Sequence, residues 1–258
     1  MDAPLVPGKM EDCPLGGRVL IGRYQLGERL GCGELGDVYA ADDLLRLSIA
    51  DEADVVVKVF HESLVDACGG VRAIAPKLAA ACRLSHPHVI NAYDFYQDGD
   101  ETLFLAMEHL GGVTLAEERL DKSRGEASLS PTEADVALRE MVDALVYMHA
   151  TTTDPLLRLN PRRLQLAGET RQLCIVDLGL SSLINQTLLC QAAMTTGMSA
   201  YLAPEVVAAG ETPDCRADQF SLGAVAMALF TGSPRGSVEE LHKALGRTGV
   251  VIWGDLLP

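Results

Sequence analysis

The spacing of hydrophobic residues changes at Gly111 and Gly112, and this change constrains the fold more than any other feature. Before the two glycines, the chain carries short β-branched or alternating runs bounded by Gly, Asp and Asn, which is typical of strands. After them, hydrophobic residues recur every three to four positions, which is typical of helices. A strand-rich piece joined to a helix-rich piece predicts an α+β chain with two lobes and a cleft between them.

The individual elements follow from the same patterns. Ser130 and Glu133 form a capping-box signature that opens a helix over residues 131–149. A short helix is expected over residues 77–84, with Pro76 in the first-turn position that helices tolerate. Further helices are expected at 218–231 and 237–245, and strands at 24–30, 37–41, 55–60, 103–107, 164–166 and 174–176.

Composition restricts the classes of function. The chain has 258 residues, and 21 Lys and Arg against 36 Asp and Glu give a formal net charge of −15. Such an acidic surface repels nucleic-acid backbones and anionic lipids. No stretch reaches the roughly 18 apolar residues that cross a bilayer. Seven cysteines without C-x-x-C spacing indicate a reducing compartment, so we expect a cytoplasmic protein with neither a disulfide framework nor a structural zinc site.

The N-terminal residues 1–22 are rich in Pro and Gly and carry acids where a signal peptide has basic residues. We expect a flexible leader that ends near Arg23.

Gly31, Gly33 and Gly36 form a G-x-G-x-x-G motif between two expected strands. Glycine lets backbone amides approach a phosphate closely, so the motif can serve a nucleotide. It can equally be a glycine-bearing hairpin turn. A dinucleotide-binding fold is disfavoured, because a strand and not a helix is expected after Gly36.

Two charged residues lie in apolar strand patterns. Lys58 follows three valines and precedes another, so it is either an edge-strand solubility device or a cation that faces a cleft. Asp177 lies between an apolar run and Gly179, and it is either a turn residue or a functional acid.

The order and spacing of these motifs resemble the protein kinase family, and most closely the bacterial, eukaryotic-like (Hanks-type) Ser/Thr kinases. The resemblance covers about residues 22–245. It implies a small antiparallel β N-lobe over residues 23–110 and a mainly helical C-lobe over residues 111–258. The motifs that carry it are the glycine loop, Lys58, Ser85-His86-Pro87, Met107-Glu108, Asp177-Leu178-Gly179, Ala203-Pro204-Glu205 and Asp218.

The resemblance also implies roles for residues. Lys58 matches the lysine that holds the α and β phosphates of ATP, and Asp177 matches the aspartate that binds magnesium. Asp218 matches the aspartate that anchors the catalytic loop, and Met107 falls beside the adenine pocket. The nucleotide-binding set implied in this way is Gly31, Gly33, Gly36, Val38, Lys58, Asp177 and the backbone of Glu108 and Leu110.

The catalytic loop departs from the family pattern H-R-D-x-K-P-x-N. With Pro161 as the anchor, Arg158 occupies the position of the catalytic aspartate and Arg163 that of the second metal ligand. A register shifted by one gives Leu159 and Leu164 instead. Neither register supplies a carboxylate to accept the substrate proton. The alternative is that Asp154 takes over from a remodelled loop.

A second departure concerns the helix glutamate that pairs with the strand lysine in the family. Lys77 falls at that position, and no Asp or Glu occurs anywhere in residues 71–90. We predict that Lys58 pairs with Asp177 instead, since Asp177 is the acidic partner that the sequence suggests.

The adenine and phosphate surroundings also differ. Gln165 replaces the apolar residue under the adenine ring, and Val56 replaces the usual alanine above it. Both changes weaken the stacking of a purine. Glu34 and Asp37 add negative charge to the glycine loop. We therefore expect ATP with magnesium to bind weakly or not at all.

The family continues with two more helices, so we expect either a C-lobe that is shortened at its C-terminus or a sequence that is a piece of a longer chain. Glu205 pairs in the family with an arginine from that part, so we predict that it lacks this partner. His86 and His88 are interpreted as a loop and packing pair, because nothing nearby completes a metal-ligand set.

Together the departures favour a pseudokinase, inactive or severely impaired, that acts as a signalling scaffold or allosteric partner of other proteins, such as an active kinase or a phospho-reader. The alternative is an unconventional Ser/Thr kinase or nucleotide transferase that uses Lys58 and Asp177 alone. A third hypothesis is a docking module switched by phosphorylation, because hydroxyls crowd the activation segment at Ser181, Ser182, Thr187, Thr195, Thr196 and Ser199. Solvated loops are also rich in hydroxyls.

Overall fold

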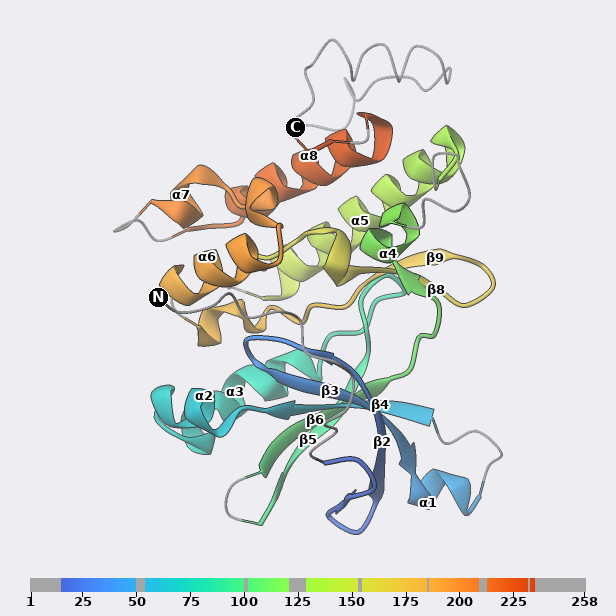
Figure 1. Ribbon diagram of the computed structural model, residues 1–258, viewed down its shortest axis with the longest axis vertical. Helices are drawn as coiled ribbons and strands as arrows, with labels where there is room; N and C mark the ends of the chain where they lie inside the picture. The colour runs from blue at the N-terminus through green and yellow to red at the C-terminus, as the bar shows by residue number, and fades with distance from the viewer. Residues whose placement is uncertain are drawn as a thin grey trace, which may run out of the picture. The chain divides into compact units, whose positions relative to one another are not determined.

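The computed structural model describes residues 15–49, 54–99, 102–120, 129–152, 155–184, 186–208, 213–231 and 233–234. The chain divides into two compact units. The first unit consists of Met1–Ala73 and Tyr93–His109, and the second of Ile74–Ala92 and Leu110–Pro258. Figure 1 labels the elements of both units.

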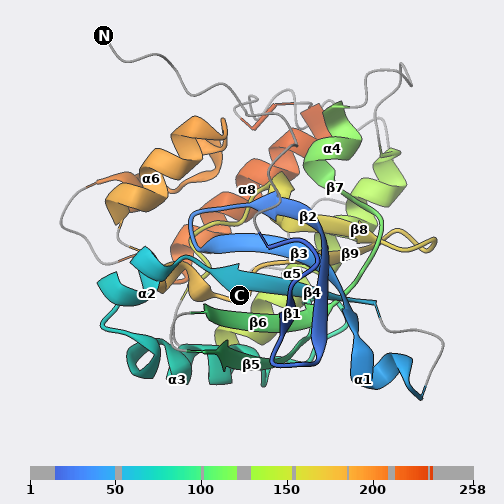
Figure 2. The same ribbon diagram turned by 60° about the horizontal axis from the view of Figure 1, so that its bottom comes forward.

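The first unit is built on a six-stranded sheet with the order β1-β2-β3-β4-β6-β5 (Figure 2). The four strands predicted before Gly111 are confirmed as β2, β3, β4 and β6. β5 was missed, because this edge strand has a single fully buried residue and therefore no hydrophobic alternation. The bounds are β1 (Val19–Leu20), β2 (Tyr24–Cys32), β3 (Gly36–Asp43), β4 (Asp54–Phe60), β5 (Ala92–Asp98) and β6 (Thr102–Glu108), with helices α1 (Leu44–Leu47) and α2 (Glu62–Ala67).

The sheet begins earlier than the sequence predicts. β1 folds back on β2, with Leu20 opposite Tyr24, and Leu20 is fully buried. The turn between them contains Gly22 with φ of 68° and Ile21 with φ of 46°. The prediction of a flexible leader through residue 22 is therefore wrong for the strand and turn at 19–22, and residues 1–14 lie outside the described part of the chain.

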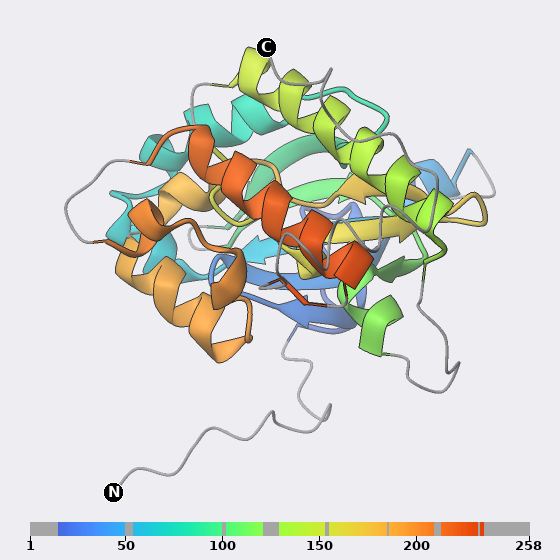
Figure 3. The ribbon, with the colours of Figure 1, turned by 90° about the horizontal axis from the view of Figure 1, so that it is seen from above.

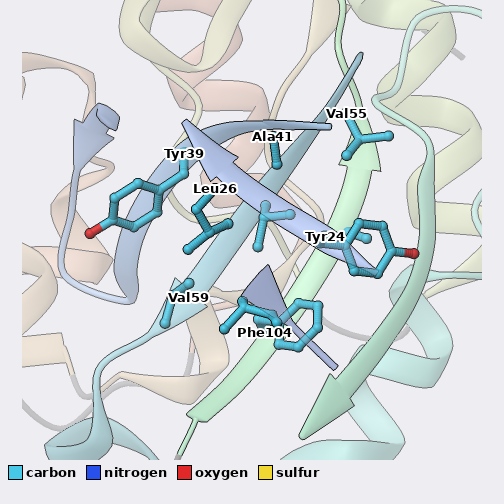
Figure 4. Packing of buried hydrophobic residues seen from close by; sticks show 10 residues of the cluster. Tyr24, Leu26, Tyr39, Ala41, Val55, Val59 and Phe104 are labelled. Carbon is cyan, nitrogen blue, oxygen red and sulfur yellow. The ribbon is translucent and has the colours of Figure 1, made fainter. Parts of the chain in front are cut away.

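One face of this sheet carries the hydrophobic core of the first unit. Alternate residues of β3 and β4 point into it, as period-two side-chain geometry requires. Figure 4 shows the interlocked aromatic and β-branched side chains of this core. Tyr24 packs edge-to-face on Phe104 with ring centroids 5.7 Å apart. The cluster comprises Leu20, Tyr24, Leu26, Tyr39, Ala41, Val55, Val57, Val59, Phe104 and Ala106.

The second unit is mainly helical. Helices α5 and α8 lie side by side (Figure 3), and a small sheet has the order β7-β8-β9. The predicted helices at 131–149 and 218–231 and the two predicted strands are confirmed, while the helix expected at 237–245 lies outside the described residues. The bounds are α3 (Val71–Ala81), α4 (Leu115–Leu120), α5 (Pro131–Thr151), α6 (Gln186–Thr195), α7 (Pro204–Val207), α8 (Arg216–Thr231), β7 (Val113–Thr114), β8 (Leu164–Ala167) and β9 (Gln172–Ile175).

The capping box at the start of α5 is confirmed. The Glu133 amide donates to Ser130 Oγ at 3.3 Å, and the Ser130 amide donates to Glu133 Oε2 at 2.7 Å. The Ser130 side chain and amide, as donors to the Glu133 carboxylate, lower its pKa. The capping box also satisfies amides at the helix start that would otherwise lack partners.

The prediction for α3 was wrong at its start, because the helix begins at Val71 and contains Pro76 in its interior. Ile74, Leu78 and Ala81 form its buried stripe. Pro76 lies on the exposed side of the helix, and its missing N–H leaves one carbonyl of the preceding turn without its helical hydrogen bond. The signal that marks the start is the pair of glycines at 69 and 70, with φ of 90° and 87°.

None of the described helices combines the length and apolar character needed to span a membrane.

A buried ion pair fixes the end of β3. Asp43 is 1% exposed and accepts from Arg23 Nη2 at 2.6 Å and Nε at 2.9 Å. Its Oδ1 also accepts from the Leu45 amide at 3.1 Å, which caps α1. The Arg23 guanidinium holds the pKa of Asp43 below its usual value.

We predict that Asp43→Asn destabilises the protein by about 1–3 kcal/mol at pH 7, because a charge-assisted bidentate pair is lost. The lowered pKa means that Asp43 stabilises the fold above its unfolded pKa of about 3.9 and loses this effect as the pH falls through its folded pKa. Urea unfolding should therefore show a gap between wild type and variant at pH 7 that shrinks toward pH 3. The exposed neighbour provides the control, Asp42→Asn, and an equal gap for both variants would contradict the prediction.

Candidate functional site

The strand register of the first unit brings predicted nucleotide-binding residues into one row. Gly31 on β2 pairs with Val38 on β3, Val38 pairs with Lys58 on β4, and Lys58 pairs with Leu105 on β6. Directly paired residues point to the same face of an antiparallel sheet. Val38 and Lys58 are half-buried, and they lie on the face opposite Tyr39 and the core cluster.

A second row extends the same face. Ala40 pairs with Val56, and Val56 pairs with Met107. Residues two apart on a strand share a face, so Val56 and Met107 accompany Lys58. Glu108 ends β6, whereas Leu110 belongs to the second unit. This face collects the first-unit part of the predicted set, and its role in nucleotide binding stays a prediction.

The glycine motif forms the hairpin between β2 and β3, which confirms the hairpin interpretation, while nucleotide binding by the motif stays a prediction. The Gly33 and Gly36 amides donate to each other's carbonyls at 3.1 and 3.2 Å. His61, which follows β4, contacts the Gly33 carbonyl through Nε2 at 2.9 Å, and its amide donates to the Leu35 carbonyl at 3.1 Å. His61 was not predicted, because only the pairing of β3 with β4 brings it to the loop.

The three glycines differ in what the fold demands of them. A Cβ on Gly36 would lie 2.0 Å from the Val59 carbonyl oxygen, so only glycine fits there. A Cβ on Gly31 would meet nothing within 4 Å, and one on Gly33 only the Gly36 carbonyl at 3.8 Å. Packing within the chain explains Gly36 but not the other two.

The negative charge expected on the loop is partly compensated. Arg29 Nη1 lies 3.7 Å from Asp37 Oδ1 across the β2–β3 pair. The sequence offered no sign of this pairing, because a register shift lies beside Arg29 on β2.

In the second unit, Asp218 organises the segment that resembles the catalytic loop. Its carboxylate is fully buried and accepts from the Leu156 amide at 2.8 Å and the Leu157 amide at 2.7 Å. His149 Nε2, from the last turn of α5, lies 2.8 Å from the same carboxylate. Asp218 anchors the loop as the resemblance implied.

The loop itself carries no acid. Arg158 is 7% exposed, and its carbonyl accepts from Asn160 Nδ2 at 2.7 Å. Asn160 Oδ1 in turn accepts from the Arg162 amide at 3.0 Å and caps the short turn Pro161–Arg163. Residues 155–163 contain neither Asp nor Glu, and Asp154 lies outside the described residues.

Backbone pairing brings Arg163 next to the segment of Asp177. The Val176 amide donates to the Arg163 carbonyl at 2.9 Å, directly after β8 and β9 pair at Leu164 and Ile175. Asp177 is 6% exposed, and its Oδ1 accepts from the Gly179 amide at 3.1 Å. In the shifted register, the second metal ligand would be Leu164, which is fully buried and apolar.

Two polar side chains have partners that the sequence did not indicate. Lys77 Nζ donates to Ser182 Oγ at 2.6 Å. Gln165, predicted as the floor of the adenine pocket, donates through Nε2 to the Gly111 carbonyl. Lys58 and Asp177 belong to different units, so their pairing stays a prediction.

His86 and His88 form a packing cluster. The His86 ring stacks on Tyr147 with centroids 4.9 Å apart, and the Tyr147 hydroxyl accepts from the Ser85 amide at 2.8 Å. Among the residues that the structure covers, no group of three metal-ligating side chains comes together.

Glu205 contributes to raising the pKa of Arg216, after the larger effect of Asp214.

Comparison with known proteins gives one consistent result. Residues 24–246 match the family model described as the protein kinase domain. The Ser/Thr kinase PknB of Mycobacterium tuberculosis is 29% identical over 217 residues, which cover 82% of this chain. The Ser/Thr kinase PrkC of Bacillus subtilis is 24% identical over 216 residues, or 84% of this chain.

Solved structures agree with these relatives. The crystal structure of the Mycobacterium tuberculosis PknI kinase domain superposes with a TM-score of 0.64 at 25% identity and covers 86% of this chain and 79% of that one. The matched parts make up 33% of PknB and 31% of PrkC, so this chain spans about a third of the length of these curated relatives.

The different surroundings of Gly36 and Gly33 predict different effects of an alanine at the two positions. Gly36→Ala should lower the midpoint of thermal unfolding by several degrees, because the backbone of β4 must shift to admit the methyl group. Gly33→Ala should change it by no more than about a degree, since the added methyl group meets only the Gly36 carbonyl, at an ordinary contact distance of 3.8 Å. Equal effects of the two variants, measured by circular dichroism, would contradict the register.

Asp218→Asn should destabilise the chain by about 2–4 kcal/mol in urea unfolding. The amide group that replaces one oxygen would face a buried N–H donor, and a buried hydrogen bond to a charged group would be lost. Asp214→Asn, two residues before the same helix, serves as the control and should cost far less, because its ion pair with Arg216 is exposed and screened by solvent. A small effect at Asp218 would show that the loop is held by other contacts.

Proposed function

This chain belongs to the protein kinase domain family, and we propose that within it the chain is a pseudokinase. It has a protein kinase fold, transfers phosphate poorly or not at all, and works as a signalling scaffold or allosteric partner of other proteins.

The observation that carries this proposal is the loop anchored by Asp218. Its backbone is held as a catalytic loop would be, yet buried Arg158 occupies the position that the resemblance assigns to the catalytic base. A guanidinium stays protonated and has no lone pair, so it cannot accept the proton of a substrate hydroxyl. Loss of a general base alone costs about 10²–10⁴-fold in rate.

The metal-binding chemistry is also incomplete. In the family, magnesium ions held by oxygen ligands neutralise the phosphates of ATP. Asp177 supplies one carboxylate, but Arg163 or Leu164 at the second position has no oxygen to offer in its side chain. The donor set therefore does not fit two magnesium ions.

The residues at the predicted nucleotide-binding positions also favour weak binding of ATP. The Gln165 side-chain amide donates to the Gly111 carbonyl, and it is a polar group at a position where the family has an apolar surface for a purine. Lys77, at the position of the helix glutamate, adds a cation where Lys58 would need an anion. Any residual ATP binding would use the glycine loop, Val38, Lys58, Asp177 and the backbone of Glu108 and Leu110.

What remains is a folded domain with a surface for partners. Its strong negative charge favours a protein partner with a basic face over nucleic acid. An active kinase or a phosphate-reading protein is the class of partner that we propose.

The test measures both phosphate transfer to a protein substrate and the binding of ATP. Purified chain with labelled ATP, magnesium or manganese and generic protein substrates should transfer no more phosphate than its Asp177→Asn variant. The Arg158→Asp variant should also stay inactive. Arg163 still leaves the second magnesium ion without an oxygen ligand, and Lys77 still stands where a glutamate would pair with Lys58. Millimolar ATP with metal should raise the midpoint of thermal unfolding by less than about 1 °C, because weak binding contributes little stability.

The opposite result identifies the rival function. Transfer by the wild type that Lys58→Ala or Asp177→Asn abolishes, together with a metal-dependent rise in the unfolding temperature, would establish an unconventional kinase. The active kinase domain of PknB serves as the positive control for the assay.

A further inference from the structure

The loop between α3 and β5 carries two histidines whose rings lie 5.5 Å apart. The loop spans residues 82–91 and belongs to the second unit. The His86 ring packs on α5, where it stacks on Tyr147 and places Nε2 3.3 Å from Asp143 Oδ2. The His86 side chain is only 13% exposed, so these neighbours restrict the movement of the ring.

A backbone hydrogen bond fixes which nitrogen of His86 carries the proton. The His88 amide donates to His86 Nδ1 at 3.2 Å, so this nitrogen must present a lone pair. The bond therefore assigns the proton of the neutral ring to Nε2, the nitrogen beside Asp143. It also closes a turn at residues 86–89, in which the Val89 amide donates to the His86 carbonyl at 3.1 Å.

This turn is attached to β9 through the backbone. The His88 carbonyl accepts from the Ile175 amide at 2.9 Å, and the Ile90 amide donates to the Ile175 carbonyl at 3.0 Å. Val89, which lies between them, is 3% exposed. Ile175 ends β9 two residues before Asp177. The turn is therefore hydrogen-bonded to the strand that leads into Asp177.

We propose that His86 is a pH-sensitive latch, which closes the turn at residues 86–89 when its ring is neutral and opens it when the ring is protonated. Histidine is the side chain that ordinarily changes its charge between pH 5 and 8. The neutral His86 ring already carries a proton on Nε2, so a second proton can be added only at Nδ1. Two N–H groups then face each other in place of the hydrogen bond from the His88 amide.

The protonated ring stays on α5, and the backbone of the turn moves. An imidazolium is attracted to the Asp143 carboxylate and to the face of the Tyr147 ring. The attraction to Asp143 is modest, because that side chain is 68% exposed and screened by solvent. With the ring held by both contacts, the backbone at His88 gives way and its hydrogen bond with Ile175 weakens.

Other titratable or charged groups surround the turn. On α5, Glu140 accepts from the Leu173 amide at 2.9 Å. In the loop, His88 Nδ1 lies 3.0 Å from the Leu173 carbonyl, and Arg83 is exposed. A proton on His88 would repel a proton on His86, so the two rings have to be tested separately.

The inference goes beyond the pseudokinase proposal and does not depend on it. It concerns a change of backbone conformation, and its readout is not phosphate transfer.

The experiment follows the full chain, labelled with nitrogen-15, from pH 8 to pH 5. Long-range proton–nitrogen NMR spectra report which ring nitrogen carries a proton, and amide hydrogen exchange reports the hydrogen bond of the His88 amide. At pH 8, His86 should carry its proton on Nε2. As Nδ1 takes up a proton, the protection of the His88 amide, relative to its intrinsic exchange rate, should fall about five- to ten-fold, because one hydrogen bond is lost.

Matched variants assign this effect to one ring. His86→Asn keeps a side-chain acceptor for the His88 amide but cannot take up a proton, so the protection should no longer depend on pH. His88→Gln should retain the pH dependence, because the backbone amide and His86 both remain. His61→Gln, in the first unit, should also retain it.

Two results from the wild-type chain would overturn the proposal. One is a proton on His86 Nδ1 at pH 8, and the other is equal protection of the His88 amide before and after His86 is protonated. Global unfolding before His86 takes up its proton, seen as exchange of the amides inside α5, would overturn it as well. Because these readouts need no variant, the proposal stays testable if His86→Asn does not fold.

Discussion

The buried carboxylate of Asp218 is the interaction on which the geometry of the second unit's loop depends. A charge removed from water is stable only when its acceptor capacity is satisfied, and here two amides and an imidazole satisfy it. One of those amides belongs to Leu157, which has φ of 59°, a conformation that a leucine keeps only when its surroundings impose it. All three contacts are to groups other than the side chains at 158 and 163. The three hydrogen bonds by which Asp218 anchors the loop therefore do not involve those two side chains.

In the first unit, the residues of the core cluster and Lys58 lie on opposite faces of the sheet. Tyr24, Phe104 and the β-branched residues around them bury one face of the sheet, and Lys58 lies on the other. Because the two faces alternate along each strand, changes on the Lys58 face leave the core side chains in place. Gly36 is an exception, since the close approach of the Val59 carbonyl makes it a structural residue as well as part of the glycine motif. Part of the glycine motif is thus a requirement of packing.

The sequence predicted what local physics determines. Period-two runs gave β2, β3, β4 and β6, and the capping box at Ser130 gave the start of α5. It failed where tertiary contacts decide: β1 is a strand because it folds back on β2, and α3 tolerates Pro76 because that residue faces water. The partners of charged groups were equally hidden, since Lys77 reaches Ser182 across 105 positions of the chain. Spacing alone could place the loop anchored by Asp218, but not what surrounds it.

In the register anchored on Pro161, three departures in the second unit share one electrostatic direction. Lys77, Arg158 and Arg163 put cations where the resemblance places two acids and an amide. Each change removes an oxygen ligand or an anion, and each adds a positive charge in a chain whose net charge is −15. Positive charge disfavours a bound metal cation and favours an anionic group. The shifted register reaches the same result by another route, because Leu159 and Leu164 are apolar and supply no oxygen ligand either.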